Sequence, residues 1–381
     1  MTTSIPRRAV TAVFLINGLT LSTYIVRAPS IKSTFRLSDA EFGATGLLFA
    51  VAALASMQLV GPLVARAGSR AVLRAMLVVM PVLLAAVAAA PGPWTFAAVA
   101  TALGAAHGTT DAAMNANAVT VERLAGRPIL NGCHAAWSVS AVVASLATAL
   151  LSHAGVPLSA HLVVAAVVLL VAGLFVTPHL LPQVLEQGSA TAARAPLTRP
   201  LIVLGLTGTA LMVCEGAALG WGGIFLHETR GATLPVAAAA VTAYTAGQTA
   251  GRLAGDRLSL RVGAGPLFRS GAALAAAGFA VAVLCGHPYA AVAGFALAGL
   301  GTSVLIPLTF SAIGKLPGAA TAALVSRFTT FTYAGILLGP ALIGWAAQVA
   351  GLARTLAALV PMLVVIALLP RPATVPAGSA R

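Results

Sequence analysis

The sequence predicts an all-α integral membrane protein with twelve transmembrane helices, arranged as two pseudo-symmetric halves of six. Hydrophobic residues make up 59% of the 381-residue chain and charged residues only 8%, with a mean hydropathy of +0.97. An ordinary soluble domain carries about 25% charged residues. The apolar residues form twelve stretches of about 20 residues, the length that crosses a hydrocarbon core of ~30 Å. A polar segment divides these stretches six and six.

Each predicted helix is an apolar stretch between shorter polar segments. In the first half these stretches cover residues 9–26, 42–65, 71–90, 94–119, 129–151 and 160–181. In the second half they cover residues 201–226, 234–254, 265–285, 289–313, 319–349 and 352–369. The first stretch follows Arg7 and Arg8 as in a signal peptide, but it lacks a small-residue cleavage site, so we keep it as a helix. The expected domains are residues 1–181, a cytoplasmic linker 182–200, and residues 201–381.

The distribution of positive charge predicts the orientation in the membrane. If both termini are cytoplasmic, fifteen lysines and arginines lie in inside segments and five in outside segments. Such an excess is the pattern of multi-pass proteins of the inner or plasma membrane. It also accounts for the formal charge of +14, so nucleic acid is not expected as a partner.

A polar stripe in residues 103–138 is the most informative feature of the first half. His107, Asp111, Asn115 and Glu122 recur at steps that return to one face of a helix. A carboxylate or imidazole is costly to expose to hydrocarbon, so this face should meet other helices or a water-filled cavity. We interpret the stripe as the lining of a transport path.

Two acids lie well inside predicted spans, Asp111 in the first half and Glu215 in the second. An embedded acid whose cavity opens to each side in turn can bind and release a proton, which makes both candidates for proton coupling. The alternative is a structural acid paired with a neighbouring Arg or His. His134 is a third candidate for proton coupling, or a hydrogen-bonding residue between packed helices.

Other polar and aromatic side chains inside the spans are candidate substrate contacts, because amides bond hydroxyl groups and aromatic faces stack on sugar rings. These are Asn17, His107, Asn115, Trp137, Trp221, Tyr244, Gln248 and Arg327. His107 and Asn115 could instead bond locally along their helix. Arg327 could equally belong to a purely structural ion pair.

A weak internal repeat links the halves. GPLVARAGSR from Gly61 corresponds to GRLAGDRLSLRVG from Gly251 at an offset of 190 residues, and other matches occur at offsets of 193 and 198. The first segment resembles a loop pattern of the major facilitator superfamily, Gly-x-x-x-Asp-Arg-x-Gly-Arg-Lys. It keeps Gly61, Arg66, Gly68 and Arg70 but has Ala65 in place of the acid, whereas the second segment carries Gly251, Arg252, Asp256 and Arg257.

The runs DAAMNANAVTVERLAGRP, NGCHAAWS and EGAALGW resemble a bacterial sugar-permease-like subgroup of that superfamily. The resemblance implies a monomeric secondary active transporter, embedded in the lipid bilayer, that works by alternating access with charged gating loops. It favours proton-coupled uptake of a sugar-like or other hydrophilic small molecule. The alternative is efflux of a drug or metabolite by proton antiport, which the Gly-Pro run GILLGPALIG leaves open.

Other functional classes lack their sequence signals. The chain has no HExxH, GxSxG or phosphate-binding P-loop, so we do not expect an enzyme. Its three cysteines lie far apart and form no CxxC pair, and no metal site or cofactor is expected. A channel would usually repeat a pore motif around an axis, whereas this chain shows two halves.

Overall fold

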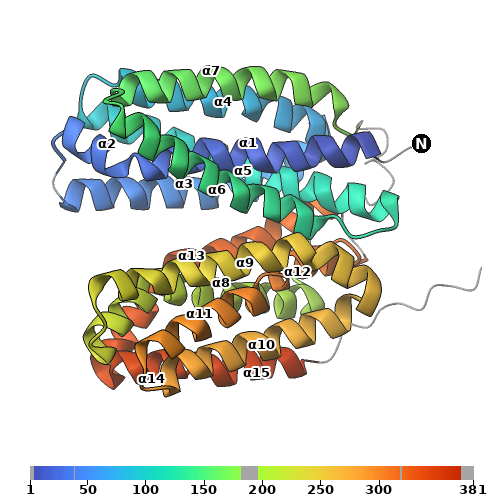
Figure 1. Cartoon of the computed structure of the whole chain (residues 1–381). Coiled ribbons are helices and arrows are strands. Elements are labelled where there is room, and N and C mark those ends of the chain that lie inside the picture. The colour runs from blue at the N-terminus through green and yellow to red at the C-terminus, as the bar shows by residue number, and fades with distance from the viewer. Residues whose placement is uncertain (1–3, 38, 182–195, 318–319, 370–381) are drawn as a thin grey trace, which may run out of the picture. The chain divides into compact units, whose positions relative to one another are not determined.

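The computed structural model describes residues 4–37, 39–181, 196–317 and 320–369, which are helical with no strand among them. The contacts divide the chain into two compact units (Figure 1). Unit 1 comprises Met1–Pro196 and Leu316–Tyr333, and unit 2 comprises Leu197–Lys315 and Ala334–Arg381. The predicted linker 182–200 stays a prediction, since most of it lies outside the described residues.

Unit 1 is a helical bundle around α5. Its helices are α1 (Ser4–Val26), α2 (Ala28–Thr34), α3 (Asp39–Ala67), α4 (Ser69–Ala89), α5 (Pro93–Ala125), α6 (Leu130–His153) and α7 (Leu158–Val176), followed by the 3₁₀ turn η1 (Thr177–His179). Helix α5 packs against α1, α3 and α4, while α1 also packs against α6 and α7. Helix α7 lies beside α4 at the outer side of this unit (Figure 1).

Unit 2 repeats much of this packing. Its helices are α8 (Arg199–Ile224), α9 (Leu234–Val262), α10 (Ala264–Leu284), α11 (Pro288–Thr302), α12 (Leu305–Ile313), α14 (Leu352–Ala357) and α15 (Leu359–Leu368), with a π-helical turn, η3 (Phe225–Thr229), after α8. Helix α13 (Thr321–Ala350) starts in unit 1 and continues in unit 2. Helix α11 packs against α9 and α10 as α5 packs against α3 and α4, and α10 packs against α15 as α4 packs against α7.

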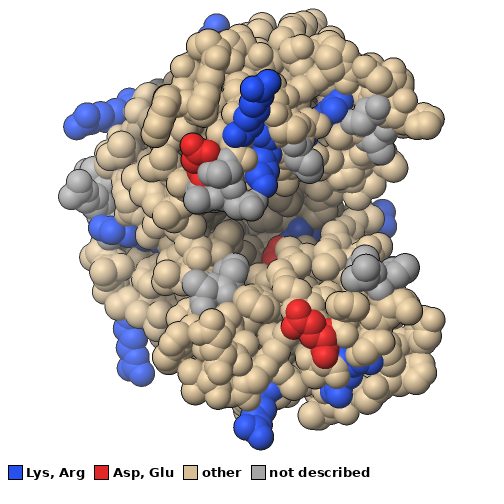
Figure 2. All heavy atoms as spheres, turned by 90° about the vertical axis from the view of Figure 1, so that its left-hand side faces the viewer, with Lys and Arg blue, Asp and Glu red and all other residues tan. Residues whose placement is uncertain are grey.

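The outward faces of several helices suit contact with lipid. Helix α7 exposes a run of valines, including Val164, Val167 and Val168, that a soluble protein would bury. Figure 2 views the helices end-on, from the left-hand side of Figure 1, and on this end of the molecule charged side chains lie scattered among other residues. Eight of the described helical segments are long and apolar enough to cross a membrane. Helices α5 and α9 are not among these eight, because polar residues interrupt their apolar sequences.

Close helix contacts repeat between the units at a constant offset. A Cβ atom at Gly104 of α5 would collide with the carbonyl oxygen of Phe49 in α3. A Cβ atom at Gly299 of α11 would likewise collide with the carbonyl oxygen of Tyr244 in α9. Each residue of the first contact corresponds to the residue 195 positions later in the second contact, 49 to 244 and 104 to 299. The close contact between helices therefore repeats between the units at an offset of 195, which lies within the range of the sequence matches at 190, 193 and 198.

The predicted gating loops are mostly helical, which corrects the sequence analysis. Single glycines in a left-handed conformation make the two turns, Gly68 with φ of 78° and Gly263 with φ of 84°. The other gating candidates lie in helices: Gly61 and Arg66 in α3, Arg70 in α4, and Gly251, Arg252, Asp256 and Arg257 in α9. Hydropathy falls where arginines begin, but long arginine side chains can continue a helix and still reach water. The prediction therefore ended the helices too early.

Two further differences concern helix continuity. The predicted helix 289–313 is divided into α11 and α12 at Ser303 and Val304, and the predicted helix 352–369 into α14 and α15 at Ala358. The short helix α2 occupies a segment predicted to be an outer loop. Hydropathy predicts where a chain crosses the membrane, but it carries little information about breaks within a crossing.

Candidate functional site

A buried hydrogen-bonded pair joins α1 to α5 in unit 1. Nδ1 of His107 lies 3.2 Å from Oδ1 of Asn17, and both side chains are buried. The other ring nitrogen, Nε2, lies 2.9 Å from the hydroxyl of Tyr333, in the part of α13 that belongs to unit 1. Because an amide oxygen only accepts, His107 donates from Nδ1 and accepts the Tyr333 proton at Nε2. The structure therefore brings together two predicted site residues and a tyrosine that the prediction missed.

Two buried asparagines of unit 1 each keep one polar atom unsatisfied. Nδ2 of Asn17 and Oδ1 of Asn115 are buried and have no hydrogen-bond partner among the described residues. The amide nitrogen of Asn115 donates to the carbonyl oxygen of Asp111 at 2.9 Å. Leaving a buried donor or acceptor without a partner costs about 1–3 kcal/mol. A polar ligand or a water molecule at these atoms would remove that cost.

Two charged candidates in unit 1 are also available for a ligand. Asp111 is half-buried, and within the described part of the chain its carboxylate has no hydrogen bond or ion pair. The half-buried side chain of Arg327 on α13 likewise has no such partner there. An unneutralised charge inside a membrane protein marks water, a substrate or a moving ion.

The side of α5 that faces α3 is fixed by close packing. Gly108 approaches Ala53 and Ser56 as Gly104 approaches Phe49. The ring of Phe49 stacks near His107, with centroids 6.1 Å apart. This packing holds the backbone that carries His107 and Asp111.

Glu122 has a structural role that the stripe interpretation did not anticipate. Its Oε2 accepts the backbone N–H groups of Ile129 at 2.8 Å and Leu130 at 3.1 Å. These groups begin α6, where free N–H groups and the positive end of the helix dipole favour a carboxylate. Gly126, in the left-handed conformation with φ of 63°, makes the turn that brings them back to Glu122. Glu122 therefore has a structural role at the start of α6, and its part in lining a path stays a prediction.

The candidates on α6 pack against α1. The ring of His134 meets Phe14 edge-on, with centroids 5.2 Å apart. The side chains of Trp137 and Ser140 lie over Gly18, so close that a Cβ atom there would collide with the Ser140 hydroxyl. The roles of His134 in proton coupling and of Trp137 in substrate binding stay predictions.

The acid of unit 2 belongs to an internal network. Oε2 of Glu215 on α8 accepts a hydrogen bond of 3.0 Å from Nε2 of Gln248 on α9. Arg252 lies one turn further along α9, is buried, and is close enough for its charge to interact with Glu215. Glu215 thus has protein partners that Asp111 lacks. This arrangement favours the structural alternative for Glu215.

Equivalent positions in the two units have diverged. At the offset of 195, Thr302 in α11 corresponds to His107 in α5, and Tyr244 corresponds to Phe49. The Tyr244 hydroxyl lies 2.9 Å from Oγ1 of Thr302, so this pair satisfies itself within unit 2. In unit 1 the apolar Phe49 cannot bond His107, which turns to Asn17 instead. At this position of the repeat, the polar side chain of unit 2 bonds within its own helix pair, whereas that of unit 1 bonds to α1.

The remaining candidates lie at helix contacts. The indole of Trp221 on α8 packs over Gly344 of α13. The guanidinium of Arg70 donates to the carbonyl oxygen of Pro178 at 3.0 Å, which ties the start of α4 to the end of η1. Tyr333 and Thr302 were missed because each lies in an apolar run and forms its hydrogen bond with a residue far away in the sequence.

Comparison with known proteins identifies the family. The family model of the Major Facilitator Superfamily matches residues 10–240. The chain belongs to this superfamily. It is therefore a multi-pass membrane transporter and not an enzyme, and the twelve-helix fold predicted from the sequence is confirmed.

Relatives and solved structures agree with this assignment. An uncharacterized MFS-type transporter of Yersinia pestis is 31% identical over 93% of this chain and 92% of its own. The membrane protein MosC of Rhizobium meliloti is 30% identical over 94% of this chain and 88% of its own. The fucose:proton symporter FucP of E. coli has a TM-score of 0.78 at 16% identity, covering 96% of this chain and 98% of its own. The proton:xylose symporter XylE has a TM-score of 0.72 at 13% identity, covering 96% and 95%.

Proposed function

We propose that this transporter moves a small hydrophilic, sugar-like solute together with protons, by alternating access. The observation that carries the proposal is that two buried asparagines of unit 1, Asn17 and Asn115, each keep an amide atom without a partner, while Asp111, one turn before Asn115 on α5, has no ion pair with a described residue. A hydroxyl group both donates and accepts, so a sugar could satisfy the nitrogen of Asn17 and the oxygen of Asn115.

The separation of roles between two kinds of group supports proton coupling. Neutral groups such as Asn17, His107 and Tyr333 suit a neutral solute, whereas the Asp111 carboxylate can exist with or without a proton. A proton-coupled transport cycle requires a group that becomes neutral when it binds a proton. The fold likeness to two proton-coupled sugar symporters is consistent with this function, although fold alone does not determine substrate.

Uptake into proteoliposomes tests the proposal. With an acidic outside medium, a panel of labelled monosaccharides should include one that accumulates, and collapsing the pH gradient should stop accumulation. Accumulation only when the vesicle interior is acidic would indicate proton antiport and efflux instead. Failure of every hydroxylated solute to be taken up or to compete would contradict the sugar-like substrate.

Two asparagines of α5 provide a matched pair for this assay. Asn115→Ala removes the free amide oxygen, and the KM for solute should rise about fivefold if one hydrogen bond to substrate is lost. Asn117→Ala should leave KM unchanged, because Asn117, two residues further along α5, lies on a different face of the helix, where its amide nitrogen donates to Ser69 of α4 at 2.7 Å. Equal KM values in both variants would remove Asn115 from the substrate site.

We also propose that both termini are cytoplasmic and that the protein works as a monomer. Reporter fusions after Arg199 and Arg371 should then give cytoplasmic signals, and fusions near Gly92 and His287 should give outside signals. The reason is the excess of lysine and arginine in alternate segments of the chain. A reversed result at either pair would contradict this topology.

A further inference from the structure

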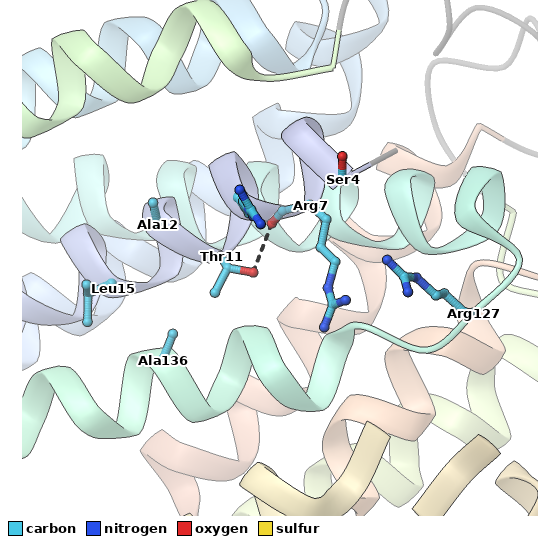
Figure 3. Close-up of a pocket in the computed structure, with 8 residues that line it drawn as sticks. Ser4, Arg7, Thr11, Ala12, Leu15, Arg127 and Ala136 are labelled. Atoms are coloured by element: carbon cyan, nitrogen blue, oxygen red, sulfur yellow. Dashed lines mark hydrogen bonds between the residues drawn. The ribbon is translucent and has the colours of Figure 1, made fainter. Parts of the chain in front are cut away.

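A cavity of about 580 Å³ opens beside the first turns of α1 in unit 1. Three arginines line it, Arg7 and Arg8 from α1 and Arg127 from the segment between α5 and α6. Figure 3 shows the side chain of Arg127 directed toward the start of α1, where Ser4, Arg7 and Thr11 lie. Positive charge from two separate parts of the chain thus converges on one space.

This positive charge has no counter-charge in the described part of the chain. No acidic residue lines the cavity, and none of the three arginines has an ion pair with a described residue. Like charges near one another repel. An anion bound among the three guanidinium groups would attract each of them and offset their mutual repulsion.

The start of α1 lies at this cavity and adds positive potential to that of the three arginines. The first backbone N–H groups of a helix are free, and the helix dipole places partial positive charge there. Helices often place an acidic residue in this turn, but the first turn of α1 (Ser4–Val26) has none. The helix start and the three side chains therefore favour the same kind of ligand.

The chemistry of the lining indicates what the anion carries. Guanidinium groups form paired hydrogen bonds with phosphate oxygens, and the hydroxyls of Ser4 and Thr11 lie at the same cavity. Deeper along α1 the lining becomes apolar, with Leu15 facing the cavity beside Ala136 of α6. A ligand with a phosphate group and an adjoining apolar part would match both regions.

We propose that this cavity binds a phosphate group, supplied either by a phospholipid headgroup or by a soluble phosphate compound. The site is distinct from the proposed transport site. Arg7 precedes Asn17 by ten residues, which is about 15 Å along a helix. Occupation of the cavity would hold the start of α1 and the α5–α6 segment together.

Binding to the purified full-length protein tests the proposal. Inorganic phosphate and dioctanoyl phosphatidylglycerol are the probes, with chloride at equal ionic strength and dioctanoyl phosphatidylcholine as their controls. Binding is measured by calorimetry and by the shift in thermal unfolding. Arg8→Gln and Arg127→Gln should each weaken saturable binding about tenfold, since each removes a charge-assisted hydrogen bond. Both side chains are exposed, so neither variant should disturb packing.

Arg74→Gln is the matched control, because Arg74 is an exposed arginine of the same unit that does not line the cavity. Binding of both probes with the same arginine dependence would mean that the site recognises phosphate itself. Binding of phosphatidylglycerol alone would assign the site to lipid, and binding of phosphate alone to a soluble compound. Non-saturable binding, or equal weakening by Arg74→Gln, would overturn the proposal and leave only general surface charge.

Discussion

Asp111→Asn is expected to abolish accumulation of solute against its gradient while leaving equilibrium exchange of solute across the membrane intact. Asparagine has nearly the shape of a protonated aspartate, but it cannot release a proton. The carboxylate of Asp111 has no hydrogen bond or ion pair with a described residue, so its replacement should leave the bundle folded. The variant can then bind solute and change conformation, but a pH gradient no longer biases the cycle. Gradient-driven uptake and counterflow exchange, measured on the same proteoliposomes, give the two readings.

Glu215→Gln is the comparison variant, and its expected effect is different. It removes the carboxylate charge that interacts with the charge of buried Arg252, and losing one charged member of a buried network is destabilising. Thermal stability should therefore fall, and exchange should fall together with accumulation. Replacing Arg252 by Met in the same chain should recover part of the stability. Full pH-driven accumulation by both acid variants would show that neither acid couples protons.

Gly104→Ala and Gly299→Ala are each expected to destabilise the folded protein by about 1–3 kcal/mol or more, because an added methyl group overpacks a close helix contact. In both cases the new Cβ atom meets a backbone carbonyl oxygen, of Phe49 in one unit and of Tyr244 in the other. Backbone atoms cannot turn aside as a side chain can. The helices must separate, and the polar positions next to each contact move with them.

Gly46→Ala in α3 is the control, since nothing lies within 4 Å of a Cβ atom there. Alanine is favoured over glycine in a helix by up to about 1 kcal/mol, so this variant should be neutral or slightly more stable. Thermal unfolding in detergent measures all three. Because the two contacts belong to separate units, the effects of Gly104→Ala and Gly299→Ala should add. A Gly104→Ala variant as stable as Gly46→Ala would contradict the close contact.

The sequence was sufficient for the fold because lipid imposes a simple rule on composition. Stretches of apolar residues long enough to cross the bilayer can be counted without knowledge of their contacts. The ends of the helices could not be predicted in this way. Arg66 and Arg257 lower the hydropathy where α3 and α9 still continue, and only the backbone conformation of Gly68 and Gly263 determines where each helix turns.

The residue types of the candidate site could be predicted from the sequence, but most of their hydrogen-bond partners could not. Asp111 and His107 could be selected because charged and imidazole groups are rare inside apolar stretches. The partner of Glu122 could not, since the N–H groups of Ile129 and Leu130 reach it only after the turn at Gly126. The hydrogen bond between Tyr244 and Thr302 depends on the approach of two helices that the sequence separates by 58 residues.

The turn at Gly68 has a consequence for how the chain enters the bilayer during synthesis. Only one residue separates α3 from α4, so we expect the two helices to enter the membrane together as a hairpin. The arginines on either side of the turn, Arg66 and Arg70, are costly to carry through hydrocarbon. In the proposed topology with cytoplasmic termini, these arginines keep the tip of the hairpin on the side from which the chain is delivered. The same expectation applies to α9 and α10, which are joined at Gly263 with Arg261 two residues before it.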